Sequence, residues 1–241
     1  MFRTILWYTN FATSLIGKIP QMSKVKQLEK KQDLQGKTEY VHQVTSKWAM
    51  SQMKLSGATV KVFGEENIPP DQGVLFVSNH QGNFDIALFM AYIDKPKGYI
   101  AKVELKKIPL LRTWMSYMNC IFMDRGDMRQ SAKAILEGIE LLKRGHSLVL
   151  FPEGTRSRGN QMGNFKAGSF KLATKSKVPI VPVTINGSYK LMEQNGGKVK
   201  PASVEIHIHP MVETDSLTKE EEIALPSKIK TIIESKLAIT S

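Results

Sequence analysis

Apolar positions follow two spacings along this chain of 241 residues. In residues 38–55 they recur at intervals of three and four, which predicts an amphipathic helix that Gly57 ends. After it, short apolar runs alternate with amphipathic stretches. The runs predict strands at residues 58–63, 73–78, 147–151, 178–185 and 204–208, and the stretches predict helices at residues 85–92, 127–145, 166–175 and from 218 onward. This alternation predicts an α/β fold in which a mixed sheet is layered with helices.

Prolines and capping residues refine this outline. Thr218 and Glu221 have the spacing of a capping box, in which the two side chains satisfy N–H groups at the start of a helix. Pro226 predicts an interruption of that helix, because proline has no N–H to donate. Pro179 and Pro182 lie inside an apolar run, which suits an edge strand or a bend beside a groove, and a plain core strand is the alternative.

The first quarter of the chain has a different character. Its first 19 residues are rich in aromatic side chains, Trp7 and Tyr8 among them, and a cluster of lysines follows. Aromatic residues favour the headgroup level of a bilayer and lysines favour an anionic surface. We therefore predict that residues 1–56 form an amphipathic two-helix motif that docks on a membrane, and that residues 57–241 form the α/β domain. The alternative is a helix that only packs on that domain.

A membrane-spanning segment is not expected. No apolar run reaches the roughly 20 residues needed to cross a bilayer. The nearest run lies at residues 5–16 and is interrupted by Asn10. Arg3 precedes it as in a signal peptide, but no cleavage site of small residues follows, so that alternative is not favoured.

The net charge points to an anionic partner. The chain carries a formal charge of +12, and its first 60 residues hold nine Lys or Arg against three acidic residues. Nucleic acid, an anionic membrane and a phosphorylated substrate all fit such a charge. The chain shows no motif that reads nucleic acid. Its one cysteine, Cys120, allows no internal disulfide and lies in an apolar stretch, which predicts a core position.

One candidate for chemistry is the pair of His80 and Asp85, which follows the predicted strand at 73–78. A turn would place Asp85 at the start of a helix, where its carboxylate could reach back to the imidazole and hold one tautomer. His80 could then act as a general base toward an alcohol. No serine or cysteine in a nucleophile-elbow pattern accompanies the pair. The alternative is that Asp85 only caps a helix and His80 lies in a turn.

Further charged residues follow other predicted strands. A carboxylate, a glycine and arginines at the end of the strand at 147–151 suit a polyol phosphate, since Glu153 could accept from a hydroxyl and Arg156 could hold a phosphate with two N–H groups. A solvated basic loop is the alternative. The candidate binding residues are Lys102, Arg125, Glu153, Gly154, Thr155 and Arg156.

The ordered segments NHQGNFD, AKVEL, FMDR, FPEGTRS, FKAG and VPIVPV resemble the glycerolipid acyltransferase family over roughly residues 55–210. The resemblance implies that His80 is the general base and Asp85 its partner, and that Lys102, Arg125, Glu153 and Arg156 shape a site for phosphate and glycerol. It implies no metal and no bound cofactor. One departure is visible, because the family usually has a glycine where Asn119 and Cys120 precede FMDR.

The implied reaction moves an acyl group from acyl-CoA or an acyl carrier protein to the sn-2 hydroxyl of lysophosphatidate, giving phosphatidic acid. Backbone N–H groups near the active-site turn are the expected donors to the tetrahedral oxyanion. The enzyme would work as a peripheral or monotopic protein at the cytoplasmic face of the cell membrane. Alternatives are acylation of glycerol 3-phosphate or another lysophospholipid, a catalytically silent membrane adaptor, and a basic nucleic-acid-binding protein.

Overall fold

The computed structural model describes residues 1–237, so the last four residues of the predicted α/β domain lie outside it. Within that range seven strands form one sheet in the order β1-β7-β6-β2-β5-β3-β4. Strands β6, β2, β5, β3 and β4 run parallel to one another, whereas β7 is antiparallel to β6 and parallel to β1. The strands are β1 Thr59–Phe63, β2 Leu75–Ser78, β3 Lys97–Lys102, β4 Ile121–Met123, β5 Ser147–Leu150, β6 Ile180–Asn186 and β7 Ser203–Ile208.

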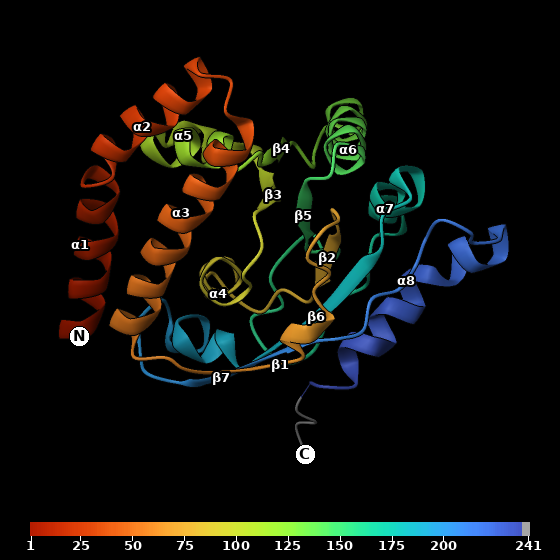
Figure 1. Cartoon of the computed structure of the whole chain (residues 1–241). Helices are drawn as coiled ribbons and strands as arrows, with labels where there is room; N and C mark the ends of the chain where they lie inside the picture. Colours follow the sequence, from red (N-terminus) through yellow and green to blue (C-terminus); the bar gives the residue numbers. More distant parts are fainter. Residues whose placement is uncertain (238–241) are drawn as a thin grey trace.

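Helices cover both faces of this sheet (Figure 1). The α-helices are α1 Phe2–Ile16, α2 Ile19–Lys30, α3 Leu34–Ser56, α4 Phe84–Tyr92, α5 Pro109–Tyr117, α6 Met128–Lys143, α7 Lys171–Ser176 and α8 Lys219–Glu234. Short 3-10 turns are η1 Glu65–Asn67, η2 Val103–Lys107, η3 Ala167–Phe170, η4 Ser188–Leu191 and η5 Glu193–Asn195. The mixed sheet layered with helices is the α/β fold predicted from the sequence.

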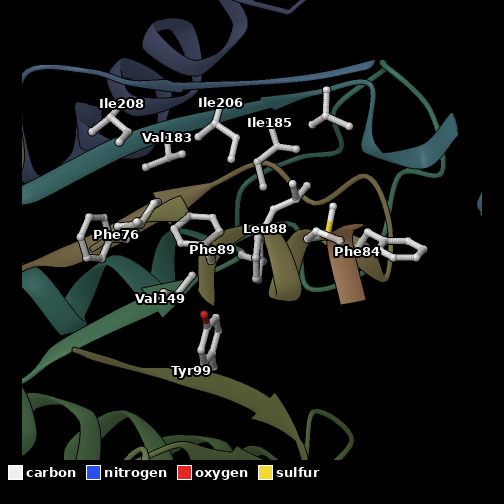
Figure 2. Close-up of a cluster of buried hydrophobic side chains, with 14 of the residues drawn as sticks. Phe76, Phe84, Leu88, Phe89, Tyr99, Val149, Val183, Ile185, Ile206 and Ile208 are labelled. Carbon is white, nitrogen blue, oxygen red and sulfur yellow. The ribbon is translucent and has the colours of Figure 1, made fainter. Parts of the chain in front are cut away.

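Alternation along the central strands divides the core in two. In β2, Phe76 points into a cluster with α4 and parts of α1 and α3, whereas Leu75 and Val77 point into a cluster with α6, α7 and α8. Figure 2 shows the first cluster, in which Phe89 lies beside Phe76 and below the side chains of β6 and β7. All four residues of β2 are buried, as expected for a strand covered on both faces.

The N-terminal helices are attached to the domain by one face. Trp7 is only 8% exposed, its ring centroid lies 5.0 Å from that of Phe84, and its indole N–H donates to the Gln52 carbonyl of α3. The opposite face of α1 is exposed and apolar, with Phe2, Ile5, Leu6 and Ile16 in solvent. No helix within residues 1–237 combines the length and the apolar character needed to cross a membrane.

The interruption predicted at Pro226 is wrong, and the alternatives left open for Pro179 and Pro182 are resolved. Helix α8 begins with the predicted capping box and continues through Pro226, which is buried against the core. Strand β6 lies between β2 and β7, so the run that contains Pro182 is a core strand and not an edge strand. At Pro182 the pairing with the chain after β7 keeps one backbone bond, in which the Pro182 carbonyl accepts the His209 N–H at 2.9 Å, so proline's missing N–H costs one bond of the ladder.

We expect the two faces of α1 to differ in what they contribute. Trp7→Ala should lower the free energy of unfolding by about 3–5 kcal/mol, because it removes a buried aromatic ring. Phe2→Ala should change it by less than about 0.5 kcal/mol, because that ring is exposed. Urea unfolding followed by fluorescence and circular dichroism would measure both, and equal effects would contradict this placement of α1.

Candidate active site

Every candidate residue lies at one edge of the sheet, because the carboxyl ends of the parallel strands meet there. His80 follows β2 and Glu153 follows β5, and these strands are neighbours. Lys102 ends β3 and Arg125 follows β4, further along the same edge. The loop after β6 flanks β2 on its other side.

His80 and Asp85 are in direct contact. The imidazole Nδ1 lies 2.7 Å from Asp85 Oδ2, and the carboxylate is fully buried while the imidazole is 17% exposed. The ring of His80 stacks on that of Phe151, with centroids 4.2 Å apart. A carboxylate beside Nδ1 favours the tautomer that carries its proton there, which leaves Nε2 able to accept a proton. This geometry suits a general base.

Asp85 has further partners that fix its orientation. Its Oδ2 also accepts the Gly82 N–H at 2.8 Å, and its Oδ1 accepts the hydroxyl of Ser188, which is buried in the loop after β6. Gln81 secures that loop, since its Oε1 accepts the N–H groups of Gly187 at 2.8 Å and Ser188 at 3.1 Å. Ser188 is not among the residues predicted from the sequence, and no local pattern marks it because it lies 103 positions after Asp85.

Glu153 supports residues 79–83, the catalytic turn that joins β2 to α4 and carries His80. The sequence predicts a substrate hydroxyl as its partner, but Oε1 accepts the His80 N–H and Oε2 accepts the Gly163 N–H, both at 2.7 Å. The side chain is 6% exposed. Burial raises the pKa of the Glu153 carboxyl above its usual value, although the two N–H bonds oppose this rise.

Arg156 pairs with Glu193, which lies outside the motifs seen in the sequence. Its Nη1 lies 3.1 Å from Oε1 of Glu193, in the short turn η5. The same oxygen accepts the Asn83 N–H at 2.8 Å. Arg156 is thus held beside the turn that carries His80, with about a third of its side chain exposed.

The turn after β2 is therefore held by three carboxylates. The N–H groups of His80, Gly82 and Asn83 are bound by Glu153, Asp85 and Glu193, respectively. Donors to an oxyanion were expected among the N–H groups near this turn. These three are already engaged, so they do not form a ready oxyanion hole.

The remaining candidates are spread along the edge. Arg125 donates to the carbonyl of Gly154, a residue with φ of 73° where a Cβ would lie 2.9 Å from Lys166 Nζ. Thr155 is exposed beside it. Lys102 pairs with Glu104 at 2.5 Å on the surface, with 62% of its side chain exposed. The structure thus groups His80, Asp85, Glu153 and Arg156 and leaves Lys102 at the periphery.

An apolar groove of about 720 Å³ adjoins this cluster. Its lining includes Ile135 and Ile139 of α6 and residues 151, 152 and 154 around Glu153, but not His80 itself. Arg125 and Lys166 lie on its lining near Gly154. This volume lies within the range of about 300–1,000 Å³ typical of small-molecule sites. Within residues 1–237, no three His, Cys, Asp or Glu side chains converge as metal ligands.

Comparison with known proteins identifies the family. A family model described as acyltransferase matches residues 59–186, which is more than half of the chain. The chain belongs to the acyltransferase family. The family membership predicted from the ordered motifs is therefore confirmed.

Several relatives of this acyltransferase have names. The 1-acyl-sn-glycerol-3-phosphate acyltransferase of Borreliella burgdorferi is 34% identical over 76% of this chain and 73% of its own length. A probable enzyme of the same name from Mycoplasma pneumoniae is 36% identical over 63% of this chain and 58% of its own length. The crystal structure of PlsC, the 1-acyl-sn-glycerophosphate acyltransferase of Thermotoga maritima, matches with a TM-score of 0.85 and 28% identity, covering 97% of this chain and 92% of that chain.

The departure of this acyltransferase from the family motif has a simple structural outcome. Asn119, which stands where the family usually has a glycine, adopts φ of 58°. Asparagine tolerates this left-handed conformation better than most residues. Cys120 is buried in the core beside Tyr99, as predicted.

The raised pKa of Glu153 makes a prediction about pH. Because the folded protein binds a proton at Glu153 more readily than the unfolded chain does, this contribution to stability is present below the ordinary glutamate pKa of about 4.3. It is lost as the pH rises through the raised pKa. Glu153→Gln is neutral throughout. The free energy of unfolding of the wild type should therefore fall, relative to that of Glu153→Gln, between about pH 4 and pH 7.

Urea unfolding of both proteins at each pH would test this. The variant's amide replaces one acceptor of an N–H bond, which adds an offset, so the slope of the difference against pH is the informative quantity. A wild type that gains stability relative to the variant over this range would contradict the raised pKa.

Proposed function

We propose that this enzyme is a 1-acylglycerol-3-phosphate O-acyltransferase. It transfers a fatty acyl group from a thioester to the sn-2 hydroxyl of lysophosphatidate and gives phosphatidic acid. The observation that carries the proposal is the contact of His80 with the buried Asp85, with Arg156 held beside the same turn and an apolar groove that begins at the loop of Glu153. The names of its relatives support this acceptor.

The reaction follows from the geometry of the pair. Nε2 of His80 removes the proton from the acceptor hydroxyl, and Asp85 stabilises the imidazolium that forms. The hydroxyl oxygen forms a bond to the thioester carbonyl carbon, giving a tetrahedral oxyanion. This intermediate collapses, the carbon–sulfur bond breaks, and the thiolate takes the proton from His80.

The basic residues suit the phosphate of the acceptor. Arg156 presents its guanidinium next to the turn that carries His80, and about a third of its side chain is exposed to an incoming anion. A guanidinium can hold a phosphate with two parallel N–H bonds. The apolar groove accommodates an acyl chain, and Arg125 and Lys166 on its lining lie where an anionic group can be held.

The donor is acyl-CoA or an acyl carrier protein. Acylation of glycerol 3-phosphate or of another lysophospholipid is the second candidate, because the same arginine and base would serve any phosphorylated glycerol. A free choice among acceptors in one assay separates these functions.

The enzyme docks on a membrane through its N-terminal helices. On α1, Phe2, Ile5 and Leu6 form an exposed apolar face, and the exposed lysines of α2 follow. Such a surface combines burial in the interface with attraction to anionic lipid. Docking of residues 1–56 would place the protein at the cytoplasmic face of the cell membrane, where an acceptor can react without leaving the bilayer.

His80→Ala should lower turnover by about 10²–10⁴-fold, because it removes the general base. His42→Ala is the matched control, since His42 also forms a 2.8 Å pair with an aspartate, Asp94, but lies away from this edge. It should keep nearly full activity. Turnover would be measured with labelled acyl donor and thin-layer analysis of the product.

The same assay tests the acceptor. Lysophosphatidate, glycerol 3-phosphate and other lysolipids are offered side by side, with acyl-CoA and acyl carrier protein as separate donors. We expect labelled phosphatidic acid to dominate. A folded His80→Ala protein with full activity, or a wild type inactive toward lysophosphatidate, would refute the proposal.

The docking surface can be tested without touching the site. Replacing Phe2, Ile5 and Leu6 by serine should weaken binding to anionic vesicles by about tenfold or more, because it removes the apolar face. The controls are Ile223→Ser and Met128→Ser, which change apolar residues on α8 and α6 that are at least as exposed. Vesicle sedimentation measures binding, and undiminished sedimentation of the triple variant would show that α1 is not the anchor.

A further inference from the structure

Glu193 is an unusual residue at the edge of the candidate site. It belongs to none of the motifs that identify the family and lies in η5, after β6. Its side chain is only 5% exposed. One oxygen, Oε1, accepts both the Asn83 N–H at 2.8 Å and Arg156 Nη1 at 3.1 Å.

The other oxygen of this carboxylate has no hydrogen-bond donor within residues 1–237. It lies against the catalytic turn, so closely that a Cβ on Gly82 would come within 2.4 Å of it. Leaving a buried carboxylate oxygen without a donor is costly, and such exceptions in folded proteins call for an explanation. A purely structural clamp on Asn83 and Arg156 would be served as well by a neutral acceptor.

The charge of Glu193 matters because of what it faces. Before substrate binds, it compensates Arg156 and holds the guanidinium in one orientation. When a phosphate approaches Arg156, the same negative charge opposes it. A fixed arginine loses less conformational freedom on binding, whereas a compensated arginine attracts an anion less strongly.

We propose that Glu193 is a positioning residue that sets the orientation of Arg156 and the affinity of the site for the acceptor phosphate. This role rests on the proposed function, in which Arg156 binds that phosphate. It also gives Glu193 a part in holding the His80 turn, through Asn83. The carboxylate thus lowers the affinity for the acceptor but fixes its position. Because the product keeps the phosphate, the same charge also speeds its dissociation.

Two variants separate the charge from the contact. Glu193→Gln keeps an oxygen for Asn83 and Arg156 but removes the charge, so it should bind a short-chain lysophosphatidate about fivefold more tightly while its kcat stays within about threefold. Glu193→Ala removes the contact as well. It should lose the gain in affinity and lower kcat by about tenfold, because the arginine and the turn both lose their partner.

The controls address electrostatics and coupling. Glu234→Gln removes one negative charge from an ion pair on α8 and should leave binding unchanged. In an Arg156→Ala background, Glu193→Gln should no longer tighten binding. Affinity is measured by calorimetry on the full chain with the short-chain lysophosphatidate, together with kcat, KM and thermal stability for each protein.

The outcomes distinguish the two proposals. A Glu193→Gln protein with unchanged affinity, in a wild type that binds and acylates lysophosphatidate, would overturn the role of Glu193 and leave the proposed function standing. Variants that lose only thermal stability, with kcat and affinity unchanged, would do the same. A wild type that binds no lysophosphatidate would overturn both.

Discussion

The catalytic turn after β2 depends on charge-assisted hydrogen bonds from three of its backbone N–H groups to three carboxylates. Asp85 comes from helix α4, Glu153 from the loop after β5 and Glu193 from the loop after β6. Bonds of this kind are shorter and stronger than neutral ones. Because Glu153 and Glu193 come from loops that follow other strands, the turn reaches its shape only when β2, β5 and β6 have assembled. The local geometry of His80 is therefore a property of the whole sheet.

At this edge of the sheet the three carboxylates that hold the turn are buried, and the basic side chains lie nearer the surface. The acidic side chains point inward and bind backbone N–H groups, while Arg156, Lys102 and Lys166 are at least partly open to solvent. A chain with a formal charge of +12 thus keeps its positive groups available for an anion. The buried Glu153 carries a raised pKa as the cost of this arrangement, since burial disfavours its charged form.

The sequence predicts contacts between residues that are close together along the chain, but not contacts between distant loops. His80 and Asp85 are five positions apart, so their contact follows from one turn and one helix start. Ser188 lies 103 positions from Asp85, and Glu193 lies 110 positions from Asn83, so only the order of the strands brings these residues together. Strand β3 was missed because its sequence begins and ends with lysine, and β4 because it has only three residues.

The attachment of α1 changes what a shortened protein would report. The helix contacts Phe84, next to Asp85, through Trp7, and it contacts the segment that follows Glu193 through Thr4, whose hydroxyl oxygen accepts the Val199 N–H at 3.1 Å. Removal of the N-terminal helices to obtain a more tractable protein would therefore remove the contacts of α1 with Phe84, beside Asp85, and with the segment that follows Glu193. Lost activity in such a truncated enzyme would not distinguish a detached membrane anchor from a distorted catalytic turn.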